Sequence, residues 1–84
     1  MHELIATIEA LPNYQLHAIF TNGQQRMYDI QPWFARVPVF EDLRVIPGLF
    51  ELVRVDCGGH GVAWNNEIDL ASEEIWCNGT PIPH

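Results

Sequence analysis

The fold is decided by residues 49–76, which read LFELVRVD (49–56), CGGHG (57–61), VAW (62–64), NNEIDL (65–70) and ASEEIW (71–76). The first and third blocks are typical of strands, and the glycine-rich block between them is typical of a turn. The stretch therefore predicts a hairpin of residues 49–56 and 61–64, followed by a short helix from about residue 71 to 78. Asp69 or Ser72 is expected to cap this helix, with Glu73 and Glu74 in its first turn.

Working outward, residues 3–11 and 14–21 alternate between apolar and polar side chains, as half-buried strands do. Asn22-Gly23 predicts a type I′ turn, which needs positive φ at both central residues, and so pairs residues 14–21 with 24–30. Residues 33–45 lie between prolines and have apolar side chains at helical spacing, which predicts one or two short helical turns.

Together these elements predict an α+β fold with one domain over residues 3–79. Its mostly antiparallel sheet has about five strands, formed by two hairpins and an N-terminal strand. A short middle helix and a short C-terminal helix pack with it. Residues 80–84 are expected to be a disordered tail.

The chain has 84 residues, a net charge of −7 and no lysine, and its four cations, the arginines at 26, 36, 44 and 54, are spread along the sequence. Direct nucleic-acid binding needs a basic patch and is therefore not expected. A chain this short buries only about 60–65% of its unfolded surface, so its core is small for its apolar content. These properties predict a protein partner, with a basic toxin as one form of it, or a homodimer.

Cys57 and Cys77 are the only thiols. The first residues resemble no signal peptide, and no apolar run is long enough to cross a membrane. We therefore expect a cytoplasmic protein with free thiols and no membrane partner.

Cys57 precedes His60 by three residues, which leaves a thiol-dependent enzyme or a small ligand-binding domain as an alternative function. A catalytic thiol needs an oriented base and a metal needs more ligands, and neither is evident nearby. The sequence therefore predicts no catalytic, cofactor-binding or metal-binding residues and no enzyme activity. Trp33 and Trp76 are the candidate interface residues, because exposed indoles often mark interfaces.

Several short motifs in a fixed order suggest a relationship to a known family: residues 20–23 (FTNG), 28–29 (YD), 39–43 (VFEDL), 50–56 (FELVRVD), 61–64 (GVAW) and 69–70 (DL). In these motifs the chain resembles, over residues 3–78, the small bacterial family known as domain of unknown function 2442. The resemblance implies no catalytic residues. It also implies that some relatives are the antitoxin half of a two-gene pair and that others carry a helix-turn-helix after this domain.

The leading hypothesis is therefore a small non-enzymatic protein-interaction domain, in its specific form the antitoxin-like partner of a small basic protein. The first alternative is the domain that uses Cys57 and His60. The second is a regulatory domain detached from a helix-turn-helix DNA-binding module.

Overall fold

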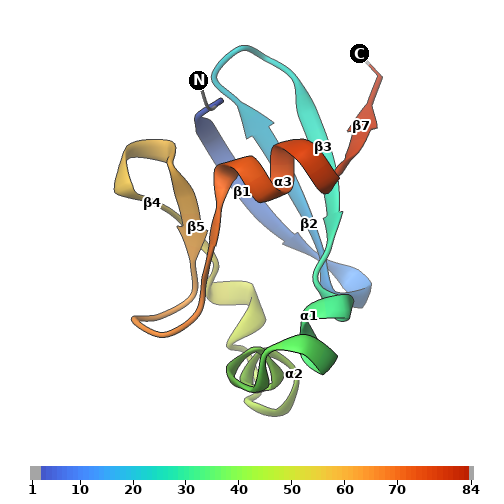
Figure 1. Ribbon diagram of the computed structural model, residues 1–84, viewed down its shortest axis with the longest axis vertical. Coiled ribbons are helices and arrows are strands. Elements are labelled where there is room, and N and C mark those ends of the chain that lie inside the picture. Colours follow the sequence, from blue (N-terminus) through green and yellow to red (C-terminus); the bar gives the residue numbers. More distant parts are fainter. Residues whose placement is uncertain (1–2, 84) are drawn as a thin grey trace.

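The computed structural model describes residues 3–83, and it has two antiparallel sheets with short helices between and beside them (Figure 1). The first sheet has the order β1-β2-β3-β7, with the strands Ile5–Leu11, Gln15–Phe20, Gln25–Asp29 and Thr80–Ile82. The second has the order β4-β5-β6, with the strands Arg54–Asp56, Gly61–Ala63 and Asp69–Ala71. The α-helices are α1 (Gln31–Arg36), α2 (Asp42–Val45) and α3 (Ser72–Asn78). The described part of the chain also has the short 3₁₀ turns η1 (Pro12–Tyr14), η2 (Pro38–Glu41), η3 (Phe50–Leu52) and η4 (Cys57–Gly59).

The predicted α+β class is confirmed, and so are the short helical turns of the middle segment. The strand arrangement differs from the prediction, because seven strands form two sheets in residues 3–83 where about five were expected in one. The two additional strands, β6 and β7, have three residues each. A strand of that length is too short to show alternation in the sequence.

The hairpin of β2 and β3 is confirmed, but its turn is not type I′. Of the two central residues expected at positive φ, only Gly23 has one, at 88°. The Gly23 N–H donates to the Phe20 carbonyl at 2.9 Å, and the Phe20 N–H donates to the Gln24 carbonyl at 2.8 Å. The loop is therefore a three-residue connection with glycine in the left-handed position, the next commonest hairpin type.

The prediction of a continuous strand over residues 49–56 is wrong in its first half. Phe50–Leu52 form η3, and the strand proper covers only Arg54–Asp56. Phe50 is buried and Leu52 is exposed, although a strand would place the side chains of these two residues on the same face of the sheet. The backbone bends at η3, which turns Phe50 into the core and leaves Leu52 exposed.

Thr80–Ile82 form β7 on the edge of the first sheet, where the sequence predicted a disordered tail over residues 80–84. The tail prediction is therefore corrected for these three residues, whereas His84 lies outside the described residues. Pro81 has no N–H to donate, and an edge strand is where a sheet tolerates proline.

The predicted C-terminal helix is confirmed as α3, with Glu73 and Glu74 in its first turn. Its predicted caps are wrong. Ala71 occupies the N-cap position and no side chain caps the helix, because β6 leads directly into α3. Ser72 is buried inside the first turn, and Asp69 lies in β6.

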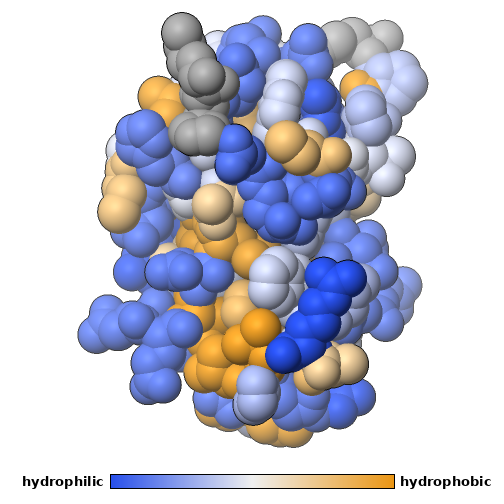
Figure 2. All heavy atoms as spheres, viewed as in Figure 1, coloured by the Kyte–Doolittle hydropathy of each residue, from blue (hydrophilic) through white to orange (hydrophobic). Residues whose placement is uncertain are grey.

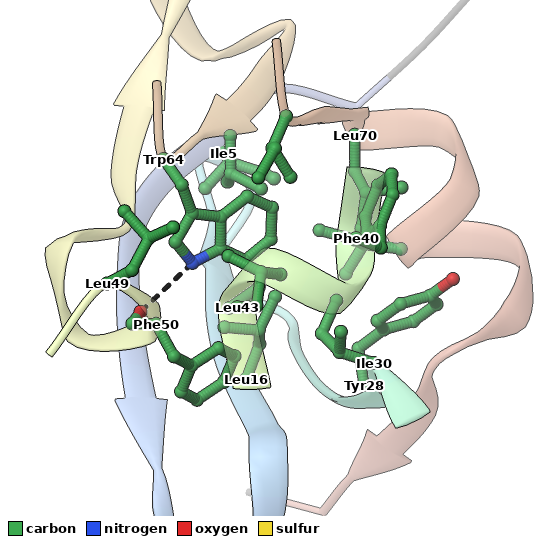
Figure 3. Packing of buried hydrophobic residues seen from close by; sticks show 14 of the residues in the cluster. Ile5, Leu16, Tyr28, Ile30, Phe40, Leu43, Leu49, Phe50, Trp64 and Leu70 are labelled. Carbon is green, nitrogen blue, oxygen red and sulfur yellow. Dashed lines mark hydrogen bonds between the residues drawn. The ribbon is translucent and has the colours of Figure 1, made fainter. Parts of the chain in front are cut away.

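The core lies between the two sheets and α3, and Trp64 at the end of β5 stands near its centre (Figure 3). The indole is 4% exposed, and its Nε1–H donates to the carbonyl of Phe50 at 2.9 Å. The rings of Phe50 and Phe40 contact the indole, with centroids 6.2 and 6.3 Å away. This aromatic group holds η2 and η3 against the second sheet. Among residues 3–83, no helix has the length and apolarity needed to cross a membrane.

Candidate functional site

A cleft of about 550 Å³ lies where β2, β3, α1, α3 and β7 meet. We name it the Trp33 cleft. Its lining consists of Gln15, Met27, Tyr28, Asp29, Pro32, Trp33, Arg36, Glu74, Asn78 and Thr80. A cleft of this size can hold a small ligand or a single side chain of a partner.

The floor of the cleft is set where β3 passes into α1. The Asp29 carboxylate accepts the N–H of Gln31 at 3.0 Å, which favours a turn at the end of the strand. Pro32 follows in the first turn of α1, where proline is well tolerated. Trp33 is thereby placed against η2, where its indole stacks on Phe40 with centroids 5.0 Å apart.

A chain of two hydrogen bonds joins three elements at the cleft. Trp33 Nε1–H donates to the Tyr28 hydroxyl at 2.7 Å, and that hydroxyl donates to Glu74 Oε2 at 2.7 Å. Burial raises the pKa of Tyr28 to about 12; the Trp33 N–H opposes this shift, and the neighbouring Glu74 carboxylate adds to it. The phenol therefore stays protonated and fixes the position of the Glu74 carboxylate.

Stability is expected to fall as the pH rises from about 10 to about 12, the two values of the Tyr28 pKa in the unfolded and folded states. The unfolded chain releases the phenol proton at a lower pH than the folded chain does. The contribution of Tyr28 to the free energy of unfolding is therefore fully present below pH 10 and is lost progressively as the pH rises to about 12. Urea unfolding of the wild type and of Tyr28→Phe, below pH 10 and at about pH 11, measures the effect. The wild type should lose more of its unfolding free energy than the variant does, and equal losses would contradict the assignment.

The cleft carries two carboxylates and one guanidinium, those of Asp29, Glu74 and Arg36. The guanidinium carbon of Arg36 lies 5.9 Å from the centroid of the Trp33 ring. A site with this composition can hold a cation by charge, by hydrogen bonding and by contact with an aromatic face. Within residues 3–83, no three His, Cys, Asp or Glu side chains converge in a way that could bind a metal ion.

Cys57 and His60 share a second, smaller hollow of about 210 Å³ beside β5 and β6, which Asp56 and Asp69 also line. Both side chains are exposed, and the bond that joins the two residues is from the His60 N–H to the Cys57 carbonyl, at 3.3 Å. Along the described chain, no hydrogen bond joins the thiol to the imidazole. The geometry lacks the thiol–base contact that a thiol-dependent enzyme needs.

The two predicted interface tryptophans lie on different helices and are both half-buried. Trp33 lines the cleft. Trp76 packs edge-on against Phe20 at 5.0 Å and lies under the Arg26 guanidinium at 3.9 Å, outside the lining of the cleft. That either tryptophan takes part in an interface stays a prediction. For Trp33, the predicted place of contact is the cleft.

Sequence reasoning missed Tyr28 and Glu74 as partners, because they are 46 residues apart and meet only where α3 crosses β3. It also missed an exposed apolar group, the residues Val45, Ile46 and Leu52, which are 59%, 46% and 64% exposed. We name this group the apolar end. Figure 2 shows hydrophobic side chains gathered near α2 at the same end of the molecule.

Comparison with known proteins finds one family. The family model with the description "Protein of unknown function (DUF2442)" matches residues 5–80. The search of curated proteins and the search of solved structures give no match.

Proposed function

Because the chain belongs to the DUF2442 family of proteins of unknown function, we propose from its surface that it is a non-enzymatic interaction domain for a basic protein partner. The observation that carries the proposal is the apolar end. Its three residues are the exposed large hydrophobic side chains of residues 3–83, and they lie within eight positions of one another. Scattered apolar side chains are ordinary on a surface, whereas a gathered group is typical of an interface.

The charge around the apolar end supports a basic partner. Residues 41–52 carry three carboxylates and one guanidinium. Arg44, the single cation, forms an ion pair with Glu41, which leaves Asp42 and Glu51 to set the sign of the local field. In a chain of net charge −7, this field attracts positive surfaces and repels a second copy of the chain.

In its specific form, the proposal is that the partner is a toxin and the chain is its antitoxin. The family resemblance and the acidity of the chain support this form, because an acidic protein can cover the basic surface of a small partner. The natural candidate is the product of the gene adjacent to this one.

Binding between the chain and the adjacent gene product is expected, and it should depend on the apolar end. In the double variant Ile46→Glu with Leu52→Glu, affinity should fall at least about 100-fold, because two exposed contacts become charged and must be desolvated. Isothermal titration calorimetry at two salt concentrations measures this, and wild-type binding should weaken as salt rises.

The matched control is Thr21→Glu, which adds the same kind of charge to an exposed residue in the β2–β3 turn, at the opposite end of the molecule from α2 (Figure 1). It should bind like the wild type. If the double variant binds as well as the control, the apolar end is not the interface. If sedimentation shows a dimer of this chain that the double variant abolishes, the occupant is a second copy and the basic partner is rejected.

A further inference from the structure

The geometry points to the Trp33 cleft as the pocket for one cationic side chain, an arginine or a lysine, that the basic partner inserts. This inference rests on the proposed function, because it names the group of the partner that the domain would hold. The cleft and the apolar end belong to consecutive elements: Trp33 lies on α1, its ring stacks on Phe40 of η2, and η2 leads into α2. A partner seated on α2 therefore has α1 within reach.

The charges in the lining of the cleft favour a positively charged ligand. The lining holds two carboxylates against one guanidinium. Glu74 is fixed by the Tyr28 hydroxyl at 2.7 Å, and Asp29 by the N–H of Gln31 at 3.0 Å. Each bond engages one carboxylate oxygen, so the other oxygen can accept from a ligand. Carboxylates held in place in this way are suited to charge-assisted hydrogen bonds with a guanidinium or an ammonium.

The apolar part of the lining suits the hydrocarbon stem of such a side chain. Met27, Pro32 and Trp33 line the same cleft as the two carboxylates. Long cationic side chains cover apolar surface with their methylene groups and keep the charged end near polar groups.

Arg36 indicates that a guanidinium can be placed over the indole. Its guanidinium carbon is 5.9 Å from the ring centroid, near the limit of a cation–π contact. Because the Arg36 side chain is exposed, it can turn to solvent when a closer guanidinium arrives. The contact thus marks the ring face that the partner's cation would use.

The test adds Nα-acetyl-arginine amide to the ¹⁵N-labelled full chain and follows the indole N–H signal of Trp33. The signal should shift and saturate, whereas the neutral citrulline analogue should leave it unchanged. Glu74→Gln keeps an oxygen for the Tyr28 hydroxyl, and it should weaken arginine amide binding about tenfold, the value of a charge-assisted bond. Glu67→Gln removes the same charge from an exposed position outside both the cleft lining and residues 41–52, and it should have no effect.

Equal binding of the citrulline analogue, or equal effects of Glu74→Gln and Glu67→Gln, would overturn the inference. Spermidine is the third probe. If spermidine binding depends on Glu74 while arginine amide binding does not, the site serves a free polyamine and the side-chain assignment is rejected.

The same variants separate this inference from the proposed function. Partner binding that is lost in the apolar-end variant but unchanged by Glu74→Gln keeps the proposed function and rejects the cleft as an anchor. Partner binding that falls about tenfold with Glu74→Gln and not with Glu67→Gln supports both. If no basic partner binds, the assignment to a partner's side chain falls with the proposed function, and arginine amide binding then shows only that the cleft accepts a cation.

Discussion

Trp64→Ala is expected to destabilise the domain by roughly 3–5 kcal/mol, the usual range for removing a large aromatic side chain from a core. The indole is 4% exposed and lies against Phe40 and Phe50, so its removal leaves a cavity that several elements share. The variant also removes the donor to the Phe50 carbonyl. Because a small domain has a total stability of only about 5–10 kcal/mol, the variant should be close to unfolding at room temperature.

Urea unfolding followed by far-ultraviolet circular dichroism measures this loss without relying on tryptophan fluorescence. Trp76→Ala is the matched control, since that indole is half-buried whereas Trp64 is almost fully buried. Trp76→Ala should lose clearly less unfolding free energy than Trp64→Ala. A Trp64→Ala midpoint equal to that of the control would show that Trp64 is not central to the core.

Gly79→Ala is expected to cost about 3 kcal/mol, the upper part of the range for forcing extra volume into a packed site. A Cβ on Gly79 would stand 2.5 Å from the Ile75 carbonyl oxygen and 3.0 Å from the Cβ of Arg26. The Gly79 N–H donates to that same carbonyl at 2.9 Å, the bond that ends α3. The methyl group must therefore move the joint between α3 and β7, and with it one wall of the Trp33 cleft.

Urea unfolding measures the loss of unfolding free energy in Gly79→Ala. Hydrogen exchange with mass spectrometry shows which part of the chain is destabilised. Exchange at residues 80–82 should become faster in Gly79→Ala. Gly48→Ala is the control: its φ is +81° but its Cβ would meet no atom within 4 Å. It should cost about 1–2 kcal/mol for the left-handed backbone and leave exchange in β7 unchanged. Similar exchange in the two variants would contradict steric crowding at Gly79.

The sequence alone determined the elements whose side-chain pattern is long enough to read. Alternation of apolar and polar side chains over six or seven residues marks β1 and β2. Asn22-Gly23 marks the turn between β2 and β3. The carboxylates of its first turn and the glycine after it mark α3. These signals are local, because each arises from residues that are neighbours in the chain. They were sufficient for the α+β class and for the family resemblance.

Only the tertiary structure decided the rest. The three-residue strands β6 and β7 form because a neighbouring strand pairs with them, and η3 forms where the chain turns Phe50 into the core. Phe50 and Leu52, which a strand would place on one face, end up buried and exposed respectively. The Trp33 cleft likewise joins residues from five elements. Contacts between residues distant in sequence set these features, and no local pattern of side chains encodes such contacts.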